Sequence, residues 1–216
     1  MNIILFGPPG AGKGTQADNI VKAFDLHKVS TGDLLRGEIS KKTNLGNEIE
    51  SIIEKGSFVS DEIINNLIEK ILSDKKYYNR LVFDGYPRNL FQAKKLDYFI
   101  KKNNQKITCV ISLNVDKEIV IKRILGRQTC IKCGLIFNEY YKPSNKNNHS
   151  CETKYLIKRS DDNEDVILKR YKTYLDITLP ILNHYKKLNL LHEIEGKTGI
   201  DEIFVKISAI IASLEA

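Results

Sequence analysis

The sequence contains no tryptophan, one methionine and five prolines, and it has no long run of apolar residues. A membrane-spanning helix needs about 20 predominantly apolar residues, and no segment of this chain approaches that length. The first ten residues, MNIILFGPPG, lack both the basic start and the apolar length of a secretory signal. We therefore expect a cytoplasmic protein with no membrane partner.

Arginine is also scarce, because only seven arginines stand among the 34 basic residues of a chain with a formal net charge of +7. A guanidinium binds phosphate bidentately, whereas a lysine ammonium acts as a hydrated point charge. Each arginine is therefore a candidate phosphate ligand, with an ordinary surface ion pair as the alternative. The net charge fits a polyanionic partner, either a nucleotide or a nucleic acid.

The four cysteines are unlike the half-cystines of a secreted protein, because disulfides rarely persist in the cytoplasm. Cys109 lies in the apolar segment KITCVISLNV and is expected in the core. Cys130, Cys133 and Cys151 lie close together in the sequence, which predicts a metal site.

The 216 residues, of which 42% are hydrophobic and 28% charged, suffice for one sizeable core. Expected strands in NIILF, RLVF, KITCVISLNV and LNLLHEIEG alternate with expected helices over 12–24, 63–72, 89–102, 116–125, 163–186 and 200–214. This alternation predicts a three-layer α/β fold, with a parallel sheet covered on both faces. Residues 30–59 are weakly apolar, and residues 127–160 do not continue the alternation of strands and helices. We expect them to be two inserted lobes on a core formed by 1–29, 60–126 and 161–216.

The segment GPPGAGKGT, from Gly7 to Thr15, follows an expected strand and opens an expected helix. Its glycines let backbone N–H groups turn toward a phosphate at the start of the helix, and Lys13 can reach the outer phosphates. Gly14 stands where such loops usually carry the Ser or Thr that holds Mg²⁺. The metal would then be held mainly by phosphates and water, which suits two nucleotides that bring phosphates from both sides.

The same loop and four further motifs, STGDLLR (30–36), FDGYPRN (83–89), GRQTCIKCG (126–134) and KRSDDNEDVILKRY (158–171), stand in the order and spacing of one family. They cover nearly the whole chain. The sequence resembles the adenylate kinase family, in its long form with an extended lid. The resemblance implies a monomeric phosphotransferase that converts MgATP and AMP into two ADP.

The resemblance also implies site residues. For the transfer itself it implies Lys13, Asp84, Arg88, Arg123, Arg159 and Arg170. For ATP it implies Gly10, Ala11, Gly12, Lys13, Gly14, Thr15, Arg123, Arg127, Ile136, Phe137 and Thr198. For AMP it implies Thr31, Arg36, Ser57, Phe58, Val59, Gly85, Tyr86, Pro87, Arg88, Gln92, Arg159 and Arg170. Six of the seven arginines thus fall on phosphate positions, and Arg80 alone is left over.

The residues themselves allow some further expectations. Thr31 and Arg36 lie about one helical turn apart and could face one monophosphate. Arg123 and Arg127 stand four residues apart, which predicts one helical face directed to the cleft. The Gln92 amide offers both the donor and the acceptor that an adenine edge requires. Asp161 and Asp162 are expected to pair with arginines, with a solvated acidic turn as the alternative.

This segment offers no fourth cysteine ligand, because the Cys-x-x-Cys pair at Cys130 and Cys133 has only Cys151 as a later partner. His149 is the nearest residue that could complete a Cys₃His zinc site, which would be structural. A water or another residue in fourth place, and a lid without metal, remain as alternatives.

Two other functions compete with the main hypothesis. A kinase for UMP or CMP would share the core, although Thr31 and Gln92 favour adenine. A zinc-ribbon protein that binds nucleic acid would explain the positive charge and the tyrosines and lysines of 138–158. It would not explain six arginines on phosphate positions, so no nucleic-acid partner is expected.

Overall fold

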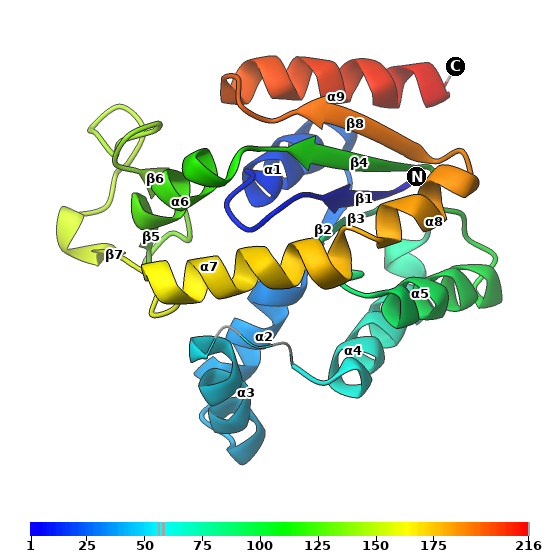
Figure 1. The fold of residues 1–216 in the computed structure, drawn as a ribbon, viewed down its shortest axis with the longest axis horizontal. Helices are drawn as coiled ribbons and strands as arrows, with labels where there is room; N and C mark the ends of the chain where they lie inside the picture. Colours follow the sequence, from blue (N-terminus) through cyan, green and yellow to red (C-terminus); the bar gives the residue numbers. More distant parts are fainter. Residues whose placement is uncertain (56, 58, 216) are drawn as a thin grey trace.

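The computed structural model describes residues 1–55, 57 and 59–215. Its centre is a parallel five-stranded sheet with the order β2-β3-β1-β4-β8 (Figure 1). The strands are β1 (Asn2–Phe6), β2 (His27–Ser30), β3 (Leu81–Asp84), β4 (Cys109–Asn114) and β8 (Leu191–Glu195). Their register places Ile4 opposite Phe83 on one side and opposite Val110 on the other.

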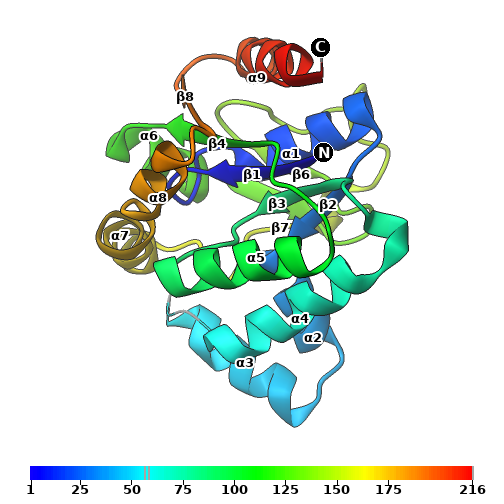
Figure 2. The same cartoon turned by 90° about the vertical axis from the view of Figure 1, so that its right-hand side faces the viewer.

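Helices cover both faces of this sheet, as Figures 1 and 2 show. Successive side chains of β1 point to opposite faces, so Ile4 joins one core and Ile3 the other. The first core takes in α4 (Asp61–Ser73), α5 (Leu90–Lys102) and α8 (Ile181–Lys187). The second takes in α1 (Lys13–Phe24), α6 (Lys117–Leu125), α7 (Glu164–Thr173) and α9 (Ile200–Glu215). The predicted three-layer α/β fold is confirmed.

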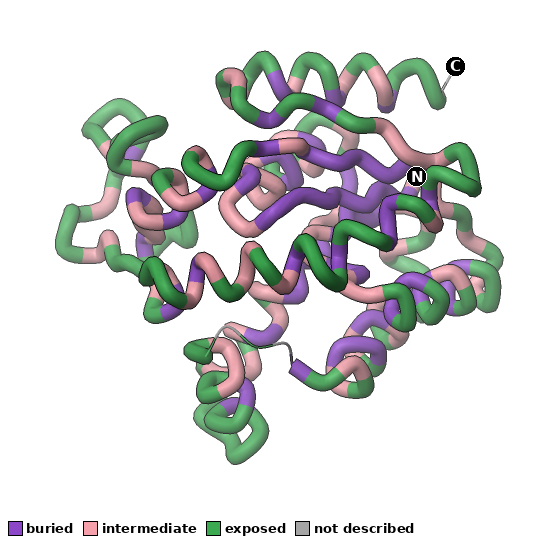
Figure 3. The backbone as a smooth tube through the Cα atoms, in the orientation of Figure 1, coloured by how far each residue is buried: buried purple, intermediate pink, exposed green. Residues whose placement is uncertain are grey.

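Burial follows this architecture. The central strands carry an almost unbroken run of buried residues, whereas the outer segments are largely exposed (Figure 3). Cys109 is fully buried within β4, as expected from its apolar neighbours. Among the described residues, no helix is both long and apolar enough to cross a membrane.

Two segments depart from the strand-and-helix alternation. After β2 the chain forms α2 (Thr31–Ser40) and α3 (Asn44–Glu54), which pack against each other. Between α6 and α7 it forms a small antiparallel sheet with the order β6-β5-β7. These strands are β5 (Arg127–Cys130), β6 (Ile136–Asn138) and β7 (Leu156–Ile157). Short 3₁₀ turns occupy Lys75–Tyr77 and Thr153–Tyr155.

The structure corrects the sequence-based elements in two places. The helix expected over 163–186 is divided into α7, a π-helical turn at Tyr174–Thr178 and α8. Pro180, which has no backbone N–H to donate, directly precedes α8. β2 was not expected, because its sequence HKVS is polar and it pairs only with β3 at the edge of the sheet.

Candidate active site

A cavity of about 390 Å³ opens where β1 and β3 end. Its wall includes the loop after β1, Asp84 and Gly85 after β3, and side chains from α2, α6, α7 and the small antiparallel sheet. The carboxyl ends of parallel strands are the usual ligand position in open α/β sheets. The cavity therefore lies where this fold is expected to bind a ligand.

The loop from Gly7 to Gly12 depends on glycine conformations. Gly10 and Gly12 have φ angles of 79° and 97°, in the left-handed region that side chains rarely adopt. A Cβ on Gly10 would also lie only 2.7 Å from Cγ1 of Ile124. The loop leads directly into α1, whose first N–H groups and dipole favour a bound anion.

Lys13 lies at the start of α1, and its Nζ donates to the backbone oxygens of Gly7 at 2.8 Å and Pro8 at 2.9 Å. Gly14 follows it, and a Cβ there would lie 3.3 Å from Oδ2 of Asp84. The absent side chain at position 14 thus leaves room for the Asp84 carboxylate beside the loop. That carboxylate is the nearest acidic group to the position where phosphate loops usually offer a hydroxyl.

Six arginines line the same cavity: Arg36, Arg88, Arg123, Arg127, Arg159 and Arg170. Arg80, the seventh, pairs with Asp25 at the surface. The convergence of six guanidinium groups from α2, α6, β5, α7 and two loops makes the cavity a site for a polyanion. The scarcity of arginine elsewhere in the chain agrees with this arrangement.

Removal from water lowers the pKa values of the cations in the cavity, and their mutual repulsion adds to the shift. Burial, together with repulsion from Arg88, Arg170 and Arg127, lowers the pKa of Lys13 to about 8, although Asp84 opposes the shift. Burial and neighbouring arginines also lower the pKa values of Arg88 and Arg159 to about 10. Arg170 shifts in the same direction, mainly through burial. An anionic ligand would remove this penalty.

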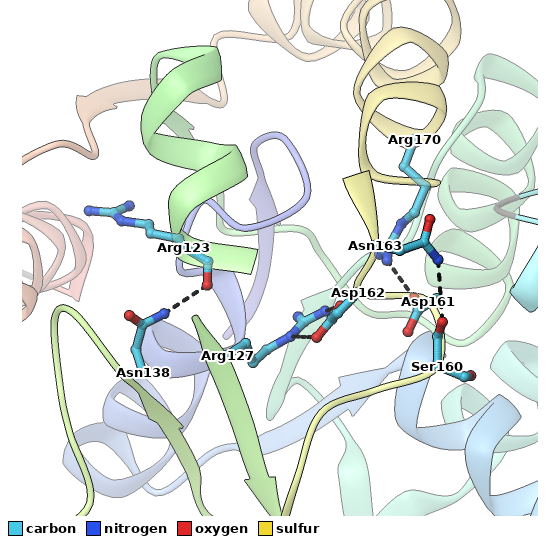
Figure 4. Close-up of polar contacts among 8 residues, drawn as sticks. All are labelled: Arg123, Arg127, Asn138, Ser160, Asp161, Asp162, Asn163 and Arg170. Carbon is cyan, nitrogen blue, oxygen red and sulfur yellow. Dashed lines mark hydrogen bonds and ion pairs between the residues drawn. The ribbon is translucent and has the colours of Figure 1, made fainter. Parts of the chain in front are cut away.

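Two aspartates at the start of the α7 segment hold two of these arginines (Figure 4). Asp162 accepts from Nε of Arg127 at 2.9 Å and also from Nη2, and its side chain has no exposed surface. Asp161 accepts from Nη1 of Arg170. The predicted pairing of Asp161 and Asp162 with arginines is confirmed, and the solvated acidic turn is not what the structure contains.

A second group of contacts surrounds Arg88 after β3. Its Nε donates to the Gly85 oxygen at 2.8 Å, and its own backbone oxygen accepts from Oγ1 of Thr178. Thr31 Oγ1 also donates to the Gly85 oxygen, at 2.9 Å. Gln92 accepts from the backbone N–H of Arg88 at 2.7 Å and donates to Asp61 at 2.7 Å.

Cys130, Cys133, His149 and Cys151 form a compact cluster, with their ligand atoms within 4.8 Å of one another. Nδ1 of His149 contacts the Ser144 hydroxyl at 3.0 Å, while Nε2 is buried without a hydrogen-bond partner. Burial raises the pKa of the Cys130 thiol, but backbone amides and the His149 side chain lower it more, to about 6. Three thiols and an imidazole held in this way match the donor set of structural zinc.

Comparison with known proteins agrees with this geometry. The family model described as adenylate kinase matches residues 5–190. The chain is 49% identical over 211 residues to a protein named adenylate kinase from Pelagibacter ubique (strain HTCC1062), covering 98% of this chain and 99% of that protein. Proteins of the same name from Thermosipho melanesiensis and Archaeoglobus fulgidus are 38% and 36% identical, with at least 98% of this chain and 99% of each protein covered. The chain belongs to the adenylate kinase family.

Most of the residues expected from the family resemblance line the cavity: Gly10, Ala11, Gly12, Lys13, Gly14, Thr15, Arg36, Ser57, Val59, Asp84, Gly85, Pro87, Arg88, Arg123, Arg127, Ile136, Phe137, Arg159, Arg170 and Thr198. Thr31, Tyr86 and Gln92 lie behind its wall and are at most 3% exposed. Phe58 lies outside the described residues.

The expectation that Arg123 and Arg127 share one helical face is wrong. Arg123 lies on α6, but that helix ends at Leu125, and Arg127 is the first residue of β5. The two arginines therefore do not share a helical face. Both still line the cavity, Arg123 from α6 and Arg127 from the start of β5.

The sequence did not single out several residues of the wall, among them Gln16, Asn138 and Tyr141. Gln16 belongs to the first turn of α1 and donates from Nε2 to the Ile200 oxygen at 2.9 Å. Asn138 and Tyr141 follow the expected pair Ile136 and Phe137, so only their nearness in sequence could have indicated them. Asn138 is the last residue of β6, and no spacing rule marks an asparagine there as part of a site.

Proposed function

We propose that this chain catalyses reversible phosphoryl transfer from MgATP to AMP, giving two ADP. The observation that carries the proposal is the convergence of six arginines and Lys13 on one cavity at the end of a parallel sheet. Two nucleotides with their phosphates face to face bring the high negative charge that this arrangement can neutralise. Membership of the adenylate kinase family supports the same reaction.

The ATP phosphates would lie on the loop of Gly10, Ala11, Gly12, Lys13, Gly14 and Thr15. Arg123 and Arg127 would contact them from α6 and β5, and the base would lie between Ile136, Phe137 and Thr198. The buried Thr198 hydroxyl, which has no hydrogen-bond partner among the described residues, supports a polar contact there. Burial of Lys13 beside three arginines favours a strongly anionic ligand at this end.

AMP would occupy the side formed by α2 and the turn after β3. Its phosphate would contact Arg36, Arg88, Arg159 and Arg170, with Thr31 and Gly85 beside it. Its base would lie near Ser57, Phe58, Val59, Tyr86, Pro87 and Gln92. Gln92 already makes one hydrogen bond from each end of its amide, and each end has capacity for one more.

In the transfer, an oxygen of the AMP phosphate attacks the γ-phosphorus of ATP in line. A bond forms between that oxygen and phosphorus as the bond to the β,γ-bridging oxygen breaks, and the electron pair leaves with ADP. Lys13, Arg123, Arg159 and Arg170 stabilise the charge that spreads over the γ-phosphoryl oxygens. Mg²⁺, held mainly by phosphates and water near Asp84, would add neutralising charge.

The two inserted segments would act as lobes that close over the nucleotides, residues 30–59 over AMP and residues 127–160 over ATP. Closure would exclude water and so protect the γ-phosphoryl group from hydrolysis. Cys130, Cys133, His149 and Cys151 would bind a structural Zn²⁺ that crosslinks the second lobe. We expect a monomer, because one chain supplies every proposed contact, and the cytoplasmic location stays a prediction.

The test is diphosphate formation by purified protein with MgATP and each of AMP, UMP, CMP and GMP. We expect ADP with AMP, and a fall of at least about a hundredfold in Arg88→Ala, because a buried charge–phosphate contact is lost. Arg80→Ala is the matched control and should keep wild-type activity, since the Arg80 side chain pairs with Asp25 at the surface and not with the residues that line the cavity.

Other outcomes separate the alternatives. Preferential transfer to UMP or CMP would contradict the role of Gln92 and favour the other kinase. No transfer to any acceptor by zinc-replete protein would contradict the proposed reaction. The zinc-ribbon hypothesis is not favoured, because the six arginines line the cavity, and a gel shift with RNA at physiological salt should show no complex.

A further inference from the structure

Asn138 joins residues 127–160, the proposed lid, to the C-terminal end of α6 through its side-chain amide (Figure 4). Its Nδ2 donates a hydrogen bond of 2.7 Å to the backbone oxygen of Arg123. The last four carbonyl groups of a helix have no partner within the helix, and α6 ends at Leu125. Asn138 therefore caps, from a different segment, the carbonyl of a residue that lines the cavity.

The other end of the same amide orders the turn that follows. Oδ1 of Asn138 accepts from the backbone N–H groups of Tyr140 at 3.0 Å and Tyr141 at 3.2 Å. Backbone N–H groups only donate and the Arg123 carbonyl only accepts, so these partners fix which way the amide faces. Paired backbone hydrogen bonds between Asn138 and Lys142 close the turn.

The lid lies directly against the helix end at this point. Gly126 accepts from the backbone N–H of Glu139 at 2.8 Å. A Cβ on Gly126 would lie 2.6 Å from Cδ2 of Tyr140, so the close approach requires glycine. Lys122 Nζ lies 5.1 Å from the centre of the Tyr140 ring. The contact is therefore a packed junction rather than a single hydrogen bond.

The junction brings Arg123 and Tyr141 together on the wall of the cavity. The guanidinium carbon of Arg123 lies 5.5 Å from the centre of the Tyr141 ring, within the range of a cation–π contact. Arg123, Asn138 and Tyr141 all line the cavity. The Asn138 side-chain amide binds Arg123 at its backbone carbonyl and Tyr141 at its backbone N–H.

We propose that Asn138 is a positioning residue for ATP, which sets Arg123 and Tyr141 against each other without contacting the reacting atoms. This inference rests on the proposed function, because that function assigns Arg123 to ATP. If the donor of Asn138 is removed, the Arg123 carbonyl loses this partner, while the hydrogen bond from Glu139 to Gly126 still joins the two segments. The AMP side is formed by other elements, α2 and the turn after β3.

Asn138→Asp removes the donor and adds a negative charge: the carboxylate still accepts from Tyr140 and Tyr141 but faces the Arg123 carbonyl without a hydrogen to donate. Asn145→Asp is the matched control. It adds the same charge to the same lid, and Asn145 also accepts from two backbone N–H groups, those of Asn147 and Asn148. Asn138→Ser is the second variant, used if Asn138→Asp fails to fold. The serine side chain is too short to reach the Arg123 oxygen, which lies 2.7 Å from Nδ2 of Asn138.

The measurement is the Kd of MgATP and, separately, of AMP by titration calorimetry on zinc-replete protein, with zinc content and Tm recorded. We expect about tenfold weaker ATP binding in Asn138→Asp, because a partly buried carbonyl loses its partner, with unchanged AMP binding. Asn145→Asp should bind both nucleotides as the wild type does. A purely structural role would instead weaken both nucleotides together.

Unchanged ATP affinity in Asn138→Asp and Asn138→Ser, or equal weakening of ATP and AMP, would overturn the inference. The proposed function fails in a different way. A wild-type protein that binds ATP, shows the selective effect of Asn138→Asp and yet transfers no phosphoryl group would refute the reaction and support the positioning role. A wild-type protein that does not bind ATP would overturn both.

Discussion

Residues 30–59 and residues 127–160 line the same cavity, but different interactions stabilise them. In the first segment, Leu35, Ile49 and Val59 are buried and belong to the main hydrophobic core. The structure describes all of residues 127–160, and among their hydrocarbon side chains Phe137 alone is buried. The centre of its ring lies 4.7 Å from that of the His149 ring. Hydrophobic packing therefore stabilises residues 30–59, whereas residues 127–160 depend on polar contacts and on the proposed zinc site at the Cys₃His cluster.

This difference predicts that metal removal will act on one lobe alone, and it gives the largest expected effect. Purified protein should contain one zinc per chain, and its removal by a chelator should lower ATP turnover roughly a hundredfold, since the lid loses its crosslink. Limited proteolysis should then cut within residues 127–160, while AMP affinity falls much less than ATP turnover, because Arg36 and Arg88 lie outside that segment.

Zinc content measured on two variants identifies the fourth ligand. His149→Ala should lose the zinc, and His149→Cys should retain it as a Cys₄ site. Zinc that stays bound in His149→Ala would contradict the assignment of His149. Protein that contains no metal, yet keeps a protease-resistant lid, would show that the two lobes do not differ as we describe.

A core substitution should act on the first lobe instead. Ile49→Ala should lower the free energy of unfolding by about 3 kcal/mol, because Ile49 is fully buried between helices that contribute to the core. Leu45→Ala on the same helix is the control and should change it by less than about 0.5 kcal/mol, since Leu45 is 40% exposed. Urea denaturation measures both, and zinc content should not change in either variant.

The smallest expected effect concerns the cavity between the lobes. Lys13, whose pKa is lowered to about 8, is increasingly uncharged above that pH in the free enzyme. The kcat/KM for ATP should therefore fall by up to about tenfold per pH unit above pH 8. The kcat should hold to higher pH, because bound phosphate raises the pKa of Lys13 again.

The stability of the folded protein depends on the protonation of Lys13 in the opposite direction. The unfolded chain binds the Lys13 proton up to its ordinary pKa near 10.5, so between about pH 8 and 10.5 the unfolded state holds more protons than the folded one. The Lys13 contribution to stability therefore increases as the pH rises through this window. A kcat/KM that stays constant from pH 7 to 10 would contradict the burial of a charged Lys13 in the site.

The sequence predicted much of this molecule, and the misses have physical causes. The phosphate loop was readable because it depends on residue types at fixed spacing. The positions of the six arginines came from the family resemblance, and the pairing of Asp161 and Asp162 was one of two expectations for that turn. β2 was not, because a short edge strand that pairs on one side needs no apolar pattern. The position of Arg127 depends on the turn at Gly126, and the role of Asn138 depends on a contact between two segments, which neither periodicity nor composition encodes.

The most direct test of the central claim is the reverse reaction. Purified protein is given MgADP alone, and its phosphorus NMR spectrum is followed with time. The two-nucleotide site predicts that ATP and AMP appear at equal rates until equilibrium, with no inorganic phosphate, and that Arg88→Ala slows both. Unchanged ADP, or release of inorganic phosphate without ATP, would contradict it.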